Sequence, residues 1–267
     1  MSKRKFEARK KETRKVIYYS DELNDEFSTA VIEPIRIDGD YAYDGFSRFA
    51  HFFWYRIVAM PIAFFYTKIA FRHKIKNAKV IKPYKRGGYC LYGNHTQDLG
   101  DACIPNMINK SKDKYVIVHP NNVSIPYIGK VAPALGALPL PDDRAAYRNF
   151  TEIIERRLAQ KNGLIVYPEA HIWPYYTGIR PFVDTSFHYP IKYGVPAFCF
   201  TNTYKKRRFS DKPKIVTYVD GPFFPDESLP PRDQRKDLRD RIYDCMCERS
   251  RESDCVYIQY IRKETEE

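Results

Sequence analysis

Short apolar runs separated by helical stretches are the feature of this sequence that most constrains its fold. The five runs cover residues 89–92, 115–118, 164–167, 196–200 and 215–219. Each is rich in β-branched or aromatic residues and is bounded by Gly, Pro, Asn or Lys, as is typical of buried strands. Because helices separate several of the runs, the pattern predicts an α/β fold with a mostly parallel central sheet flanked by helices.

Two of the helices can be placed from the sequence. The first is expected over residues 142–160, where one apolar stripe contains Phe150, Ile153, Ile154 and Leu158. It begins with two aspartates and stops before Asn162-Gly163, which is typical of a helix C-terminus. The second is expected over residues 232–251, with an inward face made of Leu238, Ile242, Cys245 and Met246.

Residues 93–101, reading GNHTQDLGD, connect the first apolar run to the segment after it. They place His95 where a buried strand ends and a helix begins, which is where α/β sheets usually carry their chemistry. A histidine followed by Asp98 and Asp101 is a candidate general base with a carboxylate that fixes its tautomer. The alternative is that Asn94 or Thr96 only caps the helix and His95 is a loop residue.

Residues 49–71 form the most hydrophobic segment of the chain. Between Arg56 and Lys68 lie only eleven uncharged residues, interrupted by Pro61, whereas crossing a bilayer takes about 20 apolar residues. We therefore expect this segment to lie in the membrane surface or to re-enter it, with its aromatic and basic residues at headgroup depth, namely Trp54, Tyr55, Tyr66, Arg56 and Lys68. A buried core helix is the alternative.

Two parts are expected in the chain. Residues 1–73 are predicted to be a basic tail and a membrane-associated helical segment, and residues 74–267 the α/β domain. The formal net charge of +12 indicates an anionic partner, which could be nucleic acid, anionic lipid or a phosphorylated substrate. Nucleic acid is not expected, because no RRM or zinc-finger pattern occurs and nucleic-acid binding does not explain the apolar segment.

The six cysteines have no spacing typical of a secreted disulfide framework, so a reducing cytoplasm is expected. Cys245 and Cys247 form a CxC pair without a second pair at zinc-site spacing, and we interpret them as ordinary helix composition. The N-terminus is charged from the start and lacks the apolar core of a signal peptide.

Four short motifs occur in an informative order. They are NHTQDLGD at residues 94–101, GALPL at 136–140 followed by Arg144, VYPE at 166–169, and GVPAF at 194–198. In this order they resemble the glycerolipid acyltransferases of the lysophosphatidic acid acyltransferase (PlsC-like) family. The resemblance covers residues 88–222, about half of the chain.

The sequence departs from the family pattern in three places. The family has four residues between its His and Asp, whereas His95 has two before Asp98 and five before Asp101. Asp101 is the preferred partner and Asp98 the alternative. The block that ends at Arg144 is two residues longer than in the family. After Glu169 the family's Gly-Thr-Arg is replaced by Ala-His-Ile, so Arg180 is the candidate to replace the arginine that holds the acceptor's phosphate.

The resemblance implies a membrane-surface O-acyltransferase with His95 as general base. It would move a fatty acyl group from acyl-CoA or acyl carrier protein to a lysophospholipid, expected to be 1-acylglycerol 3-phosphate, to give phosphatidic acid. No cofactor and no metal are implied. The enzyme would be peripheral or monotopic on the anionic cytoplasmic face of the membrane. The residues expected to bind substrate are Asn94, Thr96, Arg144, Glu169, His171 and Arg180.

Two further hypotheses fit the residues. The altered third motif is compatible with a non-catalytic relative that binds lipid or acts as a membrane scaffold. A metal-dependent hydrolase is the other, because carboxylates and imidazoles suit a divalent ion; its ligands would come from His95, Asp98, Asp101, Glu169 and His171.

Overall fold

A seven-stranded sheet forms the centre of the protein in a computed structural model that describes residues 15–27 and 32–263. The predicted basic tail at the start of the chain lies largely outside the described residues, which begin at Lys15. Neighbouring strands run parallel except for β7 and β8, which form an antiparallel hairpin. The spatial order of the strands is β2 (Lys74–Lys76), β8 (Lys214–Phe223), β7 (Ala197–Lys205), β3 (Tyr89–Gly93), β6 (Gly163–Val166), β4 (Lys114–Val118) and β5 (Ala137–Pro139). The predicted mostly parallel α/β fold is confirmed.

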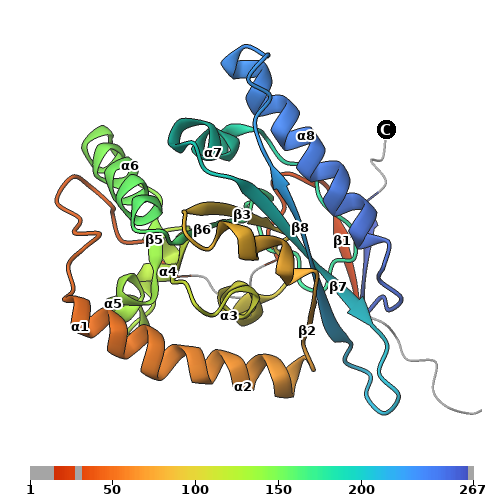
Figure 1. The fold of residues 1–267 in the computed structure, drawn as a ribbon. Helices are drawn as coiled ribbons and strands as arrows, with labels where there is room; N and C mark the ends of the chain where they lie inside the picture. Colours follow the sequence, from red (N-terminus) through yellow and green to blue (C-terminus); the bar gives the residue numbers. More distant parts are fainter. Residues whose placement is uncertain (1–14, 28–31, 264–267) are drawn as a thin grey trace, which may run out of the picture.

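Helices cover both faces of this sheet (Figure 1). One face packs against α6 (Arg144–Ala159), α7 (His188–Tyr193) and α8 (Pro231–Ser250), and the other packs against α3 (Asp98–Ile108) and the 3₁₀ helix η2 (Ala78–Tyr84). Successive side chains of a strand point to opposite faces of the sheet. The side chains of β3 are therefore buried on both faces. Short helical turns complete the connections: α4 (Asn121–Ser124), α5 (Ile128–Val131), η3 (Pro133–Leu135) and η4 (Thr185–Phe187).

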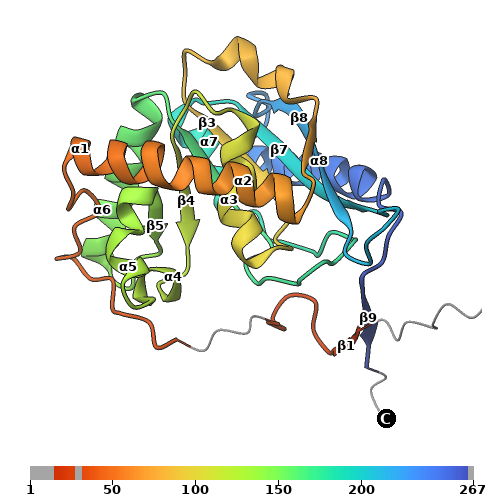
Figure 2. The same cartoon turned by 90° about the horizontal axis from the view of Figure 1, so that it is seen from below.

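The apolar segment forms one continuous helix of 23 residues, Arg48–Ala70. It consists of α1 (Arg48–His51), the π-helical η1 (Phe52–Ala59) and α2 (Met60–Ala70). It runs along the outside of the domain, across α3 (Figure 2). Tyr55 anchors it there by donating a hydrogen bond to Asn106 Oδ1 at 2.6 Å. By length and composition alone this helix could cross a membrane.

The outer side of this helix is apolar and exposed. Only 11% of its most apolar window is buried, so it is not the core helix considered as the alternative. Arg56 points back to the domain, where its Nη2 lies 2.6 Å from Asp113 Oδ1, and Lys68 Nζ donates to the His73 carbonyl at 3.0 Å. We call the exposed apolar side chains the outer face of the helix: Phe49, Phe52, Phe53, Trp54, Ile57, Ile62, Phe65 and Ile69.

The two ends of the described chain meet in a second, two-stranded sheet that was not predicted from the sequence. In it β1 (Lys15–Tyr19) runs parallel to β9 (Ile258–Arg262). Tyr260 of β9 donates to the Pro174 carbonyl at 2.9 Å, and Trp173 donates to the Asp25 carbonyl at 2.7 Å. This small sheet therefore supports the loop that follows β6.

Candidate active site

His95 lies in the loop between β3 and α3, at the carboxyl edge of the parallel strands. Two contacts fix the start of this loop against β7. The Phe200 ring occupies the space where a Cβ on Gly93 would lie, at 2.1 Å, so any larger residue here would have to displace this buried ring. Asn94 then donates to the Asn202 carbonyl at 3.1 Å and accepts from the Asn202 N–H at 2.8 Å. The predicted substrate-binding residue Asn94 is thus buried, and its side-chain amide is hydrogen-bonded to the backbone of β7.

The His95 ring is hydrogen-bonded to Asp101. Its Nδ1 lies 2.7 Å from Asp101 Oδ2, and that carboxylate oxygen also accepts from the backbone N–H groups of Thr96 at 2.8 Å and Gln97 at 2.9 Å. Asp98 is exposed. The helix begins at Asp98 rather than at His95, so Asp101 in its first turn faces back to the loop. Of the two candidate partners, Asp101 is therefore the one in contact with His95.

The contact fixes the tautomer of His95. A carboxylate only accepts hydrogen bonds, so Nδ1 carries the proton and Nε2 keeps a free lone pair. Tyr167 stacks on the ring, with 4.7 Å between ring centroids and 23° between planes. The His95 side chain remains 24% exposed whereas that of Asp101 is 3% exposed, so the imidazole keeps access to solvent while its carboxylate partner is buried.

Glu169 holds the backbone of the same loop. Its Oε2 accepts from the His95 N–H at 2.9 Å and its Oε1 from the Arg180 N–H at 3.0 Å. Burial raises the pKa of Glu169, and the Arg180 guanidinium opposes this rise. Burial likewise raises the pKa of Asp101 against the opposing hydrogen bond from His95. Both carboxylates are therefore held by donors that the fold supplies.

The guanidinium of Arg180 is buried. It donates to the carbonyls of Glu169, at 3.1 Å, and of His171, and it lies 4.9 Å from the Trp173 ring. Its side chain is 0% exposed, as is that of Glu169. In this conformation Arg180 connects the loop after β6 to the site and does not face solvent, where a phosphate acceptor would have to reach it.

The remaining predicted substrate-binding residues are dispersed. Thr96 Oγ1 accepts from the Tyr204 hydroxyl at 2.8 Å, in the interior. His171 lies 3.6 Å from a carboxylate oxygen of Glu26, measured from Nδ1. Arg144 is exposed at the first residue of α6. The five ligands of the hydrolase hypothesis do not converge: Asp98 is exposed, His171 pairs with Glu26, and Glu169 binds backbone.

Two tyrosines of the site were not predicted from the sequence. Tyr167 was visible inside the VYPE motif, but nothing in the motif indicated that its ring lies on His95. Its hydroxyl donates to the Asp101 carbonyl at 2.6 Å. Tyr204 gave no signal, because it comes from β7, more than 100 residues after Thr96.

A hollow of about 440 Å³ lies farther along the carboxyl edge, beyond the ends of β4 and β5. Arg36, His119, Leu140 and Asp142 contribute to its lining. Neighbouring strands are about 4.8 Å apart, so the end of β4 is about two strand spacings, on the order of 10 Å, from that of β3. The hollow and His95 thus share one edge of the sheet.

Comparisons with known proteins support the fold. A scan against models of protein families finds no match, and a search of curated proteins finds none either. Among solved structures, the chain is similar to the 1-acyl-sn-glycerophosphate acyltransferase PlsC from Thermotoga maritima. The TM-score is 0.53 at 18% sequence identity, over 72% of this chain and 80% of that chain. At this level of identity the similarity shows a shared fold.

Proposed function

We propose that this protein is a membrane-surface O-acyltransferase that moves a fatty acyl group from a thioester to a lysophospholipid. The observation that carries the proposal is the 2.7 Å contact between His95 Nδ1 and Asp101 Oδ2, made at the carboxyl edge of the sheet. The fold shared with an acyltransferase and the ordered motifs that resemble the PlsC-like family support it. The donor is acyl-CoA or acyl carrier protein, and the expected acceptor is 1-acylglycerol 3-phosphate.

The chemistry needs one base. His95 Nε2 takes the proton of the acceptor hydroxyl as its oxygen attacks the thioester carbonyl. The tetrahedral intermediate then collapses to the ester and expels the thiolate, which takes the proton from the imidazolium. Asp101 stabilises the imidazolium and holds the ring in place. General-base catalysis of this kind contributes about 10²- to 10⁴-fold. No covalent acyl-enzyme is required, because the thioester is already activated.

The hollow beside β4 and β5 offers a cation that could bind the acceptor's phosphate. Arg36 and His119 are exposed at its rim, whereas the guanidinium of Arg180 is buried. Arginine binds phosphate bidentately, so Arg36 is the residue we assign to headgroup binding.

A lipid substrate accounts for the outer face of the Arg48–Ala70 helix. Eight large apolar side chains are exposed on it, and exposed apolar patches of this kind mark interaction sites. With its inner side fixed to α3, the helix would lie in the plane of the membrane surface, on the cytoplasmic face. The active site would then open next to the lipid that it uses.

The test is direct formation of product. Purified full-length protein is incubated with vesicles that contain lysophosphatidic acid and with acyl-CoA or acyl carrier protein, and phosphatidic acid is measured by mass spectrometry. The proposal expects product that depends on both substrates and is lost in His95→Ala. Vesicle binding without turnover across a panel of lysophospholipids and both donors would instead support the non-catalytic lipid-binding alternative.

A further inference from the structure

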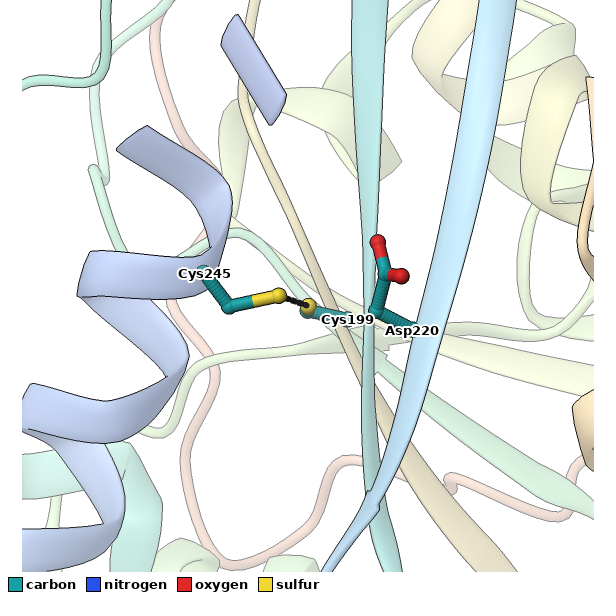
Figure 3. A group of neighbouring side chains, drawn as sticks. All are labelled: Cys199, Asp220 and Cys245. Carbon is teal, nitrogen blue, oxygen red and sulfur yellow. Dashed lines mark hydrogen bonds between the residues drawn. The ribbon is translucent and has the colours of Figure 1, made fainter. Parts of the chain in front are cut away.

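Cys199, Asp220 and Cys245 form a cluster that takes no part in the His95 network. Cys199 lies on β7 and Asp220 on β8, where the two residues are paired in register. Cys245 reaches them from α8, which packs on this face of the sheet (Figure 3). The two Sγ atoms are 3.8 Å apart, and the ligand atoms of all three residues lie within 4.8 Å of one another.

We propose that this cluster is a binding site for a thiophilic divalent cation of the zinc type. Two thiolates bound to one tetrahedral zinc ion, with Zn–S bonds of about 2.3 Å, lie about 3.8 Å apart. This is the separation that Cys199 and Cys245 already have. A disulfide would require the sulfur atoms to approach to about 2.05 Å. The third ligand is an Asp220 oxygen, and the fourth position is left for a water molecule.

Arg249 completes the site from outside. It donates to both oxygens of Asp220, from Nε to Oδ2 at 2.9 Å and from Nη2 to Oδ1 at 2.7 Å. A carboxylate has about four acceptor positions, so each oxygen can still bind a metal ion. Carboxylate ligands are commonly oriented by such second hydrogen bonds. Residues 245 and 249 are four apart on α8 and so share one face of the helix.

The charges of the occupied site balance. No net charge remains when two thiolates, one carboxylate and the Arg249 guanidinium surround a divalent ion. This neutrality lowers the free-energy cost of burying the ion. Cys199 is fully buried and Cys245 partly so, which gives the ion access from the α8 side. Binding would fix α8 to the centre of the sheet, because one ligand comes from the helix and two come from β7 and β8.

Cobalt is the probe for this site. The reduced, chelator-treated full-length protein is titrated with Co²⁺ and its absorption spectrum is recorded. We expect one equivalent to bind, with the thiolate-to-cobalt charge-transfer band and the visible bands of tetrahedral coordination, and Zn²⁺ should displace it. Cys245→Ser should lose the charge-transfer intensity of one thiolate, and Asp220→Asn should bind at least about tenfold more weakly.

Cys247→Ser is the matched control, because Cys247 is also partly buried on α8 but is outside the cluster. It should bind cobalt as the wild type does. Zn²⁺ should raise the thermal unfolding midpoint of the wild type and of Cys247→Ser but not of Cys245→Ser, whose fold without metal is checked by circular dichroism. Equal cobalt spectra in the two serine variants, no binding by the wild type, or a Cys199–Cys245 disulfide that persists under reduction would overturn the proposal.

Discussion

Glu169 binds the backbone of His95 and not its ring. Its Oε2 accepts the His95 N–H at 2.9 Å, while the ring bonds to Asp101. The two carboxylates therefore have separate tasks, since Asp101 orients the imidazole and Glu169 holds the loop that carries it. Because Glu169 also binds the backbone N–H of Arg180, the loop after β3 is tied to the loop after β6.

Replacement of Glu169 should therefore cost stability as well as activity. In Glu169→Gln one carboxylate oxygen becomes an NH₂ group, which leaves a backbone N–H unpaired and the buried guanidinium of Arg180 without its counter-charge. Breaking such a buried pair lowers the free energy of unfolding by about 3 kcal/mol. Urea denaturation measures the change, with the exposed Glu152→Gln as control. Equal unfolding curves for the two variants would contradict this role.

Tyr167 should act through its ring more than through its hydroxyl. Tyr167→Phe keeps the ring stacked on His95 and loses only the hydrogen bond to the Asp101 carbonyl, at a cost of about 1 kcal/mol in stability. Tyr167→Leu also loses the stacking surface. In Tyr167→Leu the His95 ring would lose this support and shift, which should lower the acyl-transfer rate by about 10- to 100-fold. Steady-state kinetics measure kcat/KM for both variants. A lower value for Tyr167→Phe than for Tyr167→Leu would be inconsistent with positioning by the ring.

Much of the frame of the site could be predicted from the sequence, because that frame depends on local patterns. The five apolar runs and the helices around Phe150 and Ile242 are all present. Sequence spacing left Asp98 and Asp101 open as partners of His95, because the choice depends on where α3 begins. The β1–β9 pair, Tyr204 and the Cys199 cluster depend on contacts between distant segments, which spacing along the chain does not report.

His73 should make the protein sensitive to acid. Its ring is buried, its Nε2 lies 2.8 Å from Thr217 Oγ1, and burial lowers its pKa to about 4. In the unfolded chain its pKa is about 6.5. Below pH 6.5 the unfolded state therefore binds a proton that the native state does not. The contribution of His73 to the free energy of unfolding is therefore fully present above pH 6.5 and is lost as the pH falls toward 4.

The size of this effect is about 3 kcal/mol between pH 7 and pH 4, from about 1.4 kcal/mol per pKa unit. Urea denaturation at several pH values measures it, and the difference between wild type and His73→Gln should shrink by that amount as the pH falls. The exposed His119→Gln is the control. A difference that stays constant with pH would show that His73 is protonated in the native state.

The outer face of the Arg48–Ala70 helix should bind lipid. Phe65 and Ile69 are 60% and 75% exposed, so replacing them by serine leaves the core intact. Each substitution should make the free energy of membrane binding less favourable by about 1.5 kcal/mol or more. Each should therefore weaken partition into anionic vesicles by about tenfold. Sedimentation with vesicles measures this, and Tyr147→Ser on α6, across the sheet, is the control. Equal weakening by the control would argue against binding through this face.

The central claim is that His95, oriented by Asp101, removes the proton from the acceptor hydroxyl. The measurement that tests it most directly is kcat/KM for acyl transfer to lysophosphatidic acid in His95→Ala, compared with Asp98→Asn, which changes the exposed neighbouring carboxylate. The account predicts a fall of at least about 10²-fold for His95→Ala and little change for Asp98→Asn. Equal rates for wild type and His95→Ala would contradict it.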